Sequence, residues 1–142
     1  MTIDPSTERF ELPISIAPQD IDELGHVNNV VYLRWVQDVA VAHWRARATS
    51  QEQADIVWVV VRHEIDYKTS AKLEDELIAR TWVGTATDFQ FERLTEIVRV
   101  RDRRVLASAR TFWCPIRIQT GRPARLNDET RSRFSSNAPT AA

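Results

Sequence analysis

The segment Asn29–Ala48 restricts the fold of this chain more than any other part of the sequence. Its apolar residues recur with the period of an α-helix and cover about half of its circumference at about 100° per residue. A helix this apolar is buried on most sides, and at about 1.5 Å per residue it would be about 30 Å long. The rest of the chain must therefore wrap it. The apolar positions are Val31, Tyr32, Trp35, Val36, Val39, Ala42, His43 and Ala46, widened by Leu33, Val41 and Trp44.

The flanking segments are typical of strands, because they alternate apolar and polar residues or are rich in β-branched residues. One strand precedes the helix and four follow it, joined mostly by short connections. This order predicts an α+β domain with an antiparallel sheet and a segregated helix. The expected strands are Phe10–Ile16, Ile56–Lys68, Leu77–Thr87, Phe89–Val100 and Val105–Ile118; Thr49–Asp55 reads as a polar connection and Asn127–Phe134 as a short helical turn.

The 142 residues suit a single domain, which we expect over residues 9–134 between flexible ends at 1–8 and 135–142. A formal net charge of −1 gives no electrostatic basis for binding nucleic acid. Cys114 is the only cysteine, so no disulfide framework is expected and a reducing, cytoplasmic location is favoured. No stretch approaches the ~20 apolar residues of a membrane span, so we expect no membrane partner.

The residues suited to chemistry gather just before the long helix, in Asp20–Asn29. Asp22 can act as a general base or nucleophile, and the free N–H groups at a helix start stabilise an oxyanion. The alternative is that both aspartates are loop caps; we expect this role for Asp20. His26 can orient Asp22, contact a substrate or brace the loop. No second histidine or cysteine lies at ligand spacing, so no metal is expected.

The residues that follow have plain structural alternatives. Asn28 or Asn29 is expected to cap the long helix, and this role is compatible with an oxyanion donor at the Asn29 N–H. Arg34 and Asp38 stand at pairing distance on the helix. Tyr32 and Trp35 fit the core better than a stacking site for substrate. The arginines late in the chain are expected on a solvated strand face, unless some meet phosphates of coenzyme A: Arg99, Arg101, Arg103, Arg104, Arg110, Arg117, Arg122 and Arg125.

The stretch Asp20–Leu33, D-I-D-E-L-G-H-V-N-N-V-V-Y-L, resembles the loop–helix signature of the 4-hydroxybenzoyl-CoA thioesterase-like hot-dog acyl-CoA thioesterases. Its H-V-N-N-x-x-Y portion is also similar to plant acyl-ACP thioesterases. The resemblance covers roughly residues 10–126. It implies a hot-dog fold, in which a curved antiparallel sheet of about five strands wraps a long central helix. It also implies a homodimer or homotetramer with active sites at the subunit interface.

The same resemblance assigns roles within the motif. Asp22 matches the catalytic carboxylate, the Asn29 backbone N–H the donor to the thioester carbonyl, and His26 a catalytic histidine of the plant enzymes. Gly25, Asn28 and Tyr32 fall at substrate-contacting positions. Leu24 stands where the plant enzymes carry a catalytic asparagine, which favours a mechanism centred on aspartate.

The expected function is therefore that of an acyl-CoA thioesterase, which releases a free acid and coenzyme A. Coenzyme A enters only as part of the substrate, and no other cofactor is expected. The alternatives are an acyl-ACP thioesterase and a non-catalytic acyl-binding protein of the same fold.

Overall fold

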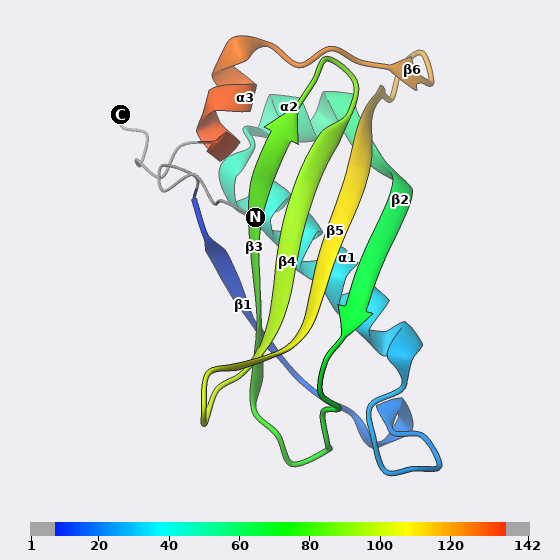
Figure 1. Ribbon diagram of the computed structural model, residues 1–142. Coiled ribbons are helices and arrows are strands. Elements are labelled where there is room, and N and C mark those ends of the chain that lie inside the picture. The colour runs from blue at the N-terminus through cyan, green and yellow to red at the C-terminus, as the bar shows by residue number, and fades with distance from the viewer. Residues whose placement is uncertain (1–7, 136–142) are drawn as a thin grey trace.

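The computed structural model describes residues 8–135, in which one face of a curled antiparallel sheet holds the long helix α1 (Figure 1). A single 3-10 turn, η1, precedes the loop that leads into α1. The elements are β1 (Phe10–Ile14), η1 (Pro18–Asp20), α1 (Asn29–Arg47), α2 (Ser50–Asp55), β2 (Ile56–Tyr67), β3 (Leu77–Ala86), β4 (Phe91–Arg99), β5 (Arg104–Arg117), β6 (Arg122–Pro123) and α3 (Asp128–Ser135).

The strands follow the spatial order β1-β3-β4-β5-β2, and the two-residue β6 pairs with β5. Every pairing is antiparallel. Five long strands around a central helix confirm the hot-dog arrangement and the α+β class expected from the sequence. β2 is an edge strand, because only β5 pairs with it within residues 8–135.

The helix α1 begins at its predicted residue and ends one residue early. The side chain of Asn28 accepts a hydrogen bond from the backbone N–H of Val30, which satisfies one of the free donors of the first turn. Val36 and Val39 are fully buried against the sheet. Burying such a side chain contributes about 1.5–3 kcal/mol, so packing, more than intrinsic propensity, stabilises this helix.

The apolar core has two parts, separated by a buried polar layer. One cluster lies under the first half of α1 and includes Ile97 of β4. The other lies toward the opposite end and includes Phe91 of the same strand. Residues two apart on a strand share a face, so Arg93 and Thr95 lie between these clusters on the side that faces the helix. Both are buried, as is His43 on α1.

The segment expected to be a polar connection is instead the helix α2, so that prediction was wrong. A capping box starts it: Glu52 N–H donates to the Thr49 hydroxyl, and the Thr49 N–H donates to the Glu52 carboxylate. Arg34 also differs from expectation, because it pairs with Asp20 at 3.2 Å and not with Asp38.

The ends of the domain lie close to their predicted positions. Glu8, assigned from the sequence to the flexible N-terminus, bonds through its carboxylate to His43 and Arg47. The rest of the predicted flexible ends, 1–7 and 136–142, lies outside the described residues. Among residues 8–135, no helix has the length and apolar character needed to cross a membrane.

Candidate functional site

The loop before α1 is a small hydrogen-bonded hairpin. Ile21 and Val27 form an isolated antiparallel bridge, and the Asp22 N–H donates to the His26 carbonyl at 2.8 Å. Gly25 N–H donates to the Asp22 carbonyl at 3.0 Å, and Gly25 has a φ of 79°. This left-handed conformation is strained for residues with a Cβ, so Gly25 serves the turn of the loop.

Asp20 holds this hairpin to the rest of the protein. Its side chain is buried and accepts hydrogen bonds from the Ala17 N–H at 2.9 Å and from Arg34 at 3.2 Å. The Ala17 N–H, followed by Arg34, keeps the pKa of Asp20 below its ordinary value. The predicted role of Asp20 as a loop-fixing acceptor is confirmed.

Asp22 caps the loop with one oxygen and leaves the other free. Its Oδ1 accepts from the backbone N–H groups of Leu24 at 2.9 Å and His26 at 3.2 Å. Its Oδ2 has no hydrogen-bond partner within residues 8–135. The capping role that the sequence allowed is therefore real, and it fixes the carboxylate while one oxygen stays available for chemistry.

The start of α1 lies directly after this hairpin. Asn28 is the N-cap, and the Asn29 backbone N–H has no acceptor among the described residues. The carbonyl of Asn29 accepts from the Tyr67 hydroxyl at 3.1 Å, which ties the start of α1 to the end of β2. The His26 ring is half-buried and, in the described part of the chain, its nitrogens make no hydrogen bond. The loop thus brings together a carboxylate, an imidazole and an open helix N-terminus.

Tyr32, a predicted substrate contact, lies in the core. It is 2% exposed, its hydroxyl accepts from the Ala71 N–H at 3.0 Å, and its ring packs edge-on against Trp35 and Tyr67. Burial raises the pKa of the Tyr32 hydroxyl. This is the core position that the sequence favoured for Tyr32.

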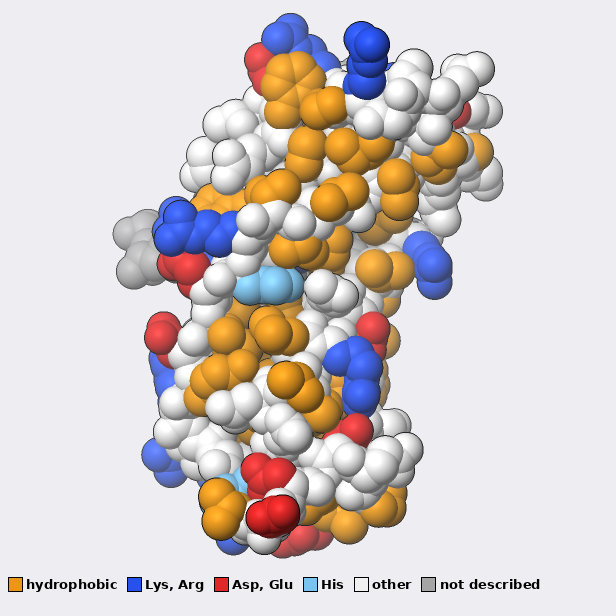
Figure 2. Space-filling view, turned by 90° about the vertical axis from the view of Figure 1, so that its right-hand side faces the viewer, with side chains coloured by type: hydrophobic (Ala, Val, Ile, Leu, Met, Phe, Trp, Pro, Cys, Tyr) orange, Lys and Arg blue, Asp and Glu red, His pale blue; other side chains and the backbone are white. Residues whose placement is uncertain are grey.

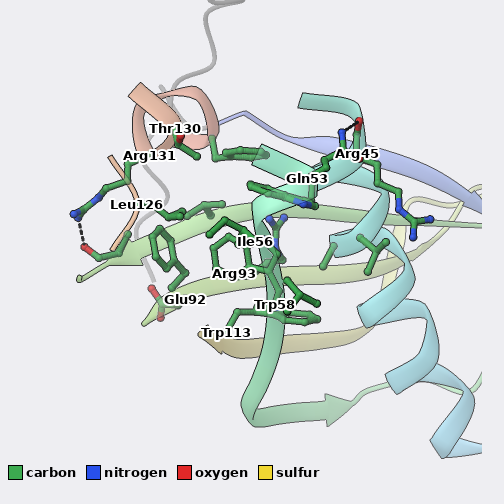
Figure 3. Close-up of a pocket in the computed structure, with 18 of the residues that line it drawn as sticks. Arg45, Gln53, Ile56, Trp58, Glu92, Arg93, Trp113, Leu126, Thr130 and Arg131 are labelled. Carbon is green, nitrogen blue, oxygen red and sulfur yellow. Dashed lines mark hydrogen bonds between the residues drawn. The ribbon is translucent and has the colours of Figure 1, made fainter. Parts of the chain in front are cut away.

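A cavity of about 590 Å³ lies at the other end of α1. Its walls come from the second half of α1, the start of β2, the ends of β3–β5 and α3 (Figure 3). This volume suits a small organic ligand, and its wall is rich in aromatic rings. No pattern in the sequence indicated this cavity, and none of the six predicted site residues lines it. The aromatic lining residues are Trp44, Trp58, Phe91, Trp113 and Phe134.

A buried polar network reaches the cavity wall through Arg93. Arg93 Nη1 donates to His43 Nδ1 at 2.9 Å and to the Thr81 hydroxyl at 3.3 Å. Since arginine only donates, His43 carries its proton on Nε2 and donates it to Glu8 Oε1 at 2.6 Å. Burial, and next the Arg93 charge, lowers the pKa of His43 to about 4. Burial also lowers the pKa of Arg93 to about 10, so Arg93 stays charged at neutral pH.

The alternation in β4 held a signal for this arginine. Arg93 alternates with Phe91, Thr95 and Ile97, so the sequence placed it on an apolar face of a strand. A charged residue at a position on an apolar strand face is the sequence signal that could have identified Arg93. Among the late arginines, Arg99, Arg110 and Arg125 form ion pairs with Asp102, Glu92 and Asp88. The described residues contain no cluster of three or more His, Cys, Asp or Glu side chains that could hold a metal ion.

The chain resembles known proteins in both sequence and structure. Residues 16–134 match the family model of the thioesterase-like superfamily. No curated protein sequence matches significantly. A 1,4-dihydroxy-2-naphthoyl-CoA thioesterase from Synechocystis superposes with a TM-score of 0.76 at 19% identity, covering 89% of this chain and 95% of that one.

Two further structures share the architecture at low sequence identity. A thioesterase from Thermus thermophilus, complexed with coenzyme A and Zn, has a TM-score of 0.76 at 22% identity and covers 88% of this chain and 96% of its own. A probable thioesterase from Escherichia coli has a TM-score of 0.73 at 23% identity, with coverage of 87% and 95%. These likenesses establish the fold, and the family match extends over most of the chain. The protein belongs to the thioesterase-like superfamily and has its hot-dog fold.

Proposed function

We propose that this protein hydrolyses acyl-CoA thioesters to a free acid and coenzyme A. The observation that carries this proposal is the free Oδ2 of Asp22, on a fixed loop that leads into an open helix N-terminus at Asn29. Membership in the thioesterase-like superfamily supports the reaction class. The coenzyme A bound by the Thermus thermophilus neighbour supports coenzyme A as the carrier.

In the proposed reaction, Asp22 acts on the thioester carbonyl, which accepts a hydrogen bond from the Asn29 N–H. As a base, Asp22 takes a proton from water while the water oxygen bonds to the carbonyl carbon. The C–S bond then breaks, and the proton passes to the departing thiolate. As a nucleophile, Asp22 attacks the carbonyl carbon, the C–S bond breaks and the coenzyme A thiolate departs, and water then hydrolyses the resulting anhydride to the free acid and the Asp22 carboxylate. Either route develops negative charge on the carbonyl oxygen, where a donor at a helix start is most effective. His26 is proposed to assist by orienting Asp22 or the substrate.

We infer that two copies of the chain complete the site by pairing along β2. This edge strand has twelve residues and exposes Val57, Val59 and Val61 at 46–57%. Figure 2 views the molecule from this edge and shows hydrophobic side chains over its upper and middle parts. Long exposed edge strands invite pairing, and a twofold-symmetric dimer is the commonest outcome.

Antiparallel pairing of two β2 strands would bring the loop of one copy to the cavity of the other. The start of α1 lies beside the end of β2, as the Tyr67–Asn29 hydrogen bond shows. The cavity is lined from β2 by Ile56, Val57 and Trp58, at the opposite end of that strand. A twofold axis across β2 would therefore set the catalytic loop of one protomer against the cavity of its partner.

The test compares Asp22→Asn with Glu23→Gln, its exposed neighbour in the same loop. An asparagine oxygen can still accept from Leu24 and His26, so the loop should persist in the Asp22 variant. General-base catalysis contributes about 10²–10⁴-fold, so turnover of acyl-CoA should fall by that factor in Asp22→Asn alone. The measurement is free-thiol release from a panel of acyl-CoA and acyl-ACP substrates. Wild-type turnover in Asp22→Asn would remove Asp22 from the mechanism. Activity on acyl-ACP substrates alone would mean that the carrier is the acyl carrier protein and not coenzyme A.

A further inference from the structure

The cavity wall offers more hydrogen-bond donors than acceptors. Three arginines and one glutamate contribute to its lining. The glutamate, Glu92, is already engaged, since it accepts from the Thr85 N–H at 2.9 Å and pairs with Arg110 outside the cavity. A wall of this kind suits a ligand that brings its own acceptor and negative charge. The three lining arginines are Arg45, Arg93 and Arg131.

Arg93 is the arginine of the cavity wall that water reaches least. It is only 9% exposed, and both of its hydrogen bonds use Nη1. Within residues 8–135, Nε and Nη2 make no hydrogen bond, and no ion pair reaches this guanidinium directly. The nearest carboxylate in the network, Glu8, is reached only through His43. A buried charge is ordinarily paired, so the unbonded Nε and Nη2 of Arg93 call for a hydrogen-bond acceptor.

Two tryptophans on the same wall carry the same deficit. The indole N–H groups of Trp58 and Trp113 are buried and have no hydrogen-bond partner within the described chain. A buried donor that is left unsatisfied destabilises the protein, because it has lost its hydrogen bonds to water. Both rings lie with Arg93 around the cavity in Figure 3. The unused Nε and Nη2 of Arg93, together with two unbonded indole N–H groups in the same wall, point to an acceptor group on the ligand.

We propose that Arg93 binds a carboxylate at the far end of the acyl group, so that the preferred substrates are thioesters of dicarboxylic acids with an apolar middle. This inference rests on the proposed thioesterase function and names its substrate class. The aromatic wall would take the apolar part of the acyl group, and the guanidinium would take the terminal carboxylate through two parallel hydrogen bonds. If Arg93 only held His43 in place, its Nε and Nη2 would remain without an acceptor.

The first arm of the test measures binding without turnover. Octanoate and octanamide share their chain and differ in charge, and the tryptophans in the cavity wall report either ligand by fluorescence. Hydrogen bonds to a charged group contribute about 1.5–3 kcal/mol, so octanoate should bind about 10–100-fold more tightly than octanamide. Arg93→Gln should abolish this preference. Arg104→Gln, which removes an exposed charge outside the cavity, should keep it.

The second arm compares suberoyl-CoA with octanoyl-CoA, which have the same chain length. The wild-type protein should favour suberoyl-CoA by on the order of 10–100-fold in kcat/KM, and Arg93→Gln should lose or reverse that ratio. If Arg93→Gln does not fold, the double variant Trp58→Phe/Trp113→Phe keeps both rings and removes both N–H groups. It should then lower octanoate affinity several-fold and leave octanamide affinity unchanged.

The outcomes separate this inference from the proposed function. Equal binding of octanoate and octanamide, or a preference that survives in Arg93→Gln, overturns the carboxylate site even if octanoyl-CoA is hydrolysed. A carboxylate preference without faster hydrolysis of suberoyl-CoA overturns the substrate class. Failure to hydrolyse any thioester, with an Arg93-dependent preference for octanoate, overturns the thioesterase function and leaves the carboxylate site standing.

Discussion

The two ends of α1 differ in what they offer a substrate. At its start, the hairpin carries Asp22 with a free oxygen, and the neighbouring core is densely packed around Tyr32 and Trp35. Near its end lies the cavity, whose one glutamate, Glu92, is already bonded. The helix has 19 residues, and at ~1.5 Å per residue its ends are about 28 Å apart. The start of α1 lies beside the groups suited to chemistry, and its other end lies beside the cavity that could hold an acyl group.

This difference explains why a single chain is a poor candidate for a complete enzyme. Beside the loop that carries Asp22, the core is filled by buried side chains such as Tyr32 and Trp35, so an acyl group finds little space there. Toward the other end lies the cavity, which is lined by residues of β2, α2 and α3 among others. Pairing of two chains along β2 would unite the two functions, because twofold symmetry exchanges the ends of that strand.

The largest predicted effect comes from mixing two inactive variants. Asp22→Asn lacks the carboxylate, and Val41→Trp places a large ring on an exposed residue of the cavity wall. Each variant alone should have little turnover. In a mixed dimer, the Asp22 loop of one chain would meet the open cavity of the other. Random exchange makes about half of the dimers mixed, each with one intact site of two, so turnover should recover to about a quarter of wild type.

Ala46→Trp provides the matched control, because Ala46 is exposed on the same helix and does not line the cavity. Alone, it should retain turnover. Light scattering should give a mass of two or four times 16.4 kDa for every variant. If mixtures recover nothing although the chains exchange, the loop and the cavity do not act together across an interface.

The second prediction concerns the polar layer between the two halves of the core. His43 has a pKa of about 4 in the folded protein and an ordinary value of 6.5. Between these values, the unfolded chain binds a proton that the folded chain does not, so acidification favours unfolding. The contribution of His43 to the free energy of unfolding should fall as the pH drops from 6.5 to 4, by up to about 3 kcal/mol at 1.36 kcal/mol per unit, and should level off below pH 4.

Urea unfolding at several pH values, compared between the wild type and His43→Gln, isolates this contribution. The charged groups that face His43 are Arg93, Glu8 and Arg47, and all three are present in both proteins. His63 also has a pKa lowered by burial, so it adds a slope of the same sign to both proteins. The wild type should show the steeper dependence. Identical slopes would mean that His43 is protonated inside the folded protein.

The two ends of α1 also differ in how far the sequence predicted them. The loop that carries Asp22 was predictable, because Asp22, Gly25 and Asn28 act through local backbone geometry that neighbouring residues determine. The positions of the strands along the chain and most of the buried face of α1 followed from periodicity, which is likewise local. The Thr49–Glu52 capping box was visible in the sequence as well, but α2 is short and lacks an apolar face, so composition indicated a connection.

The cavity was not predictable, because it results from how distant segments pack. Arg45, Ile56, Arg93 and Leu126 line one space although no local pattern relates them. Its size depends on how far the end of the helix stands from the sheet, and side-chain volumes across several elements determine that distance. The unbonded N–H groups of Trp58 and Trp113 have no signature in sequence for the same reason.

The smallest predicted effect compares the helix caps at the two ends. Asn28→Ala removes the acceptor of the Val30 N–H, and Thr49→Ala removes the acceptor of the Glu52 N–H. Each should lower the free energy of unfolding by about 1 kcal/mol, measured by urea titration. Their effects on turnover should differ, because only Asn28 adjoins the proposed oxyanion donor. Asn28→Ala should slow thioester hydrolysis, Asn28→Asp should restore most of the loss, and Thr49→Ala should leave kcat unchanged. Equal losses of turnover in both alanine variants would mean that stability, and not the geometry at the start of α1, limits the reaction.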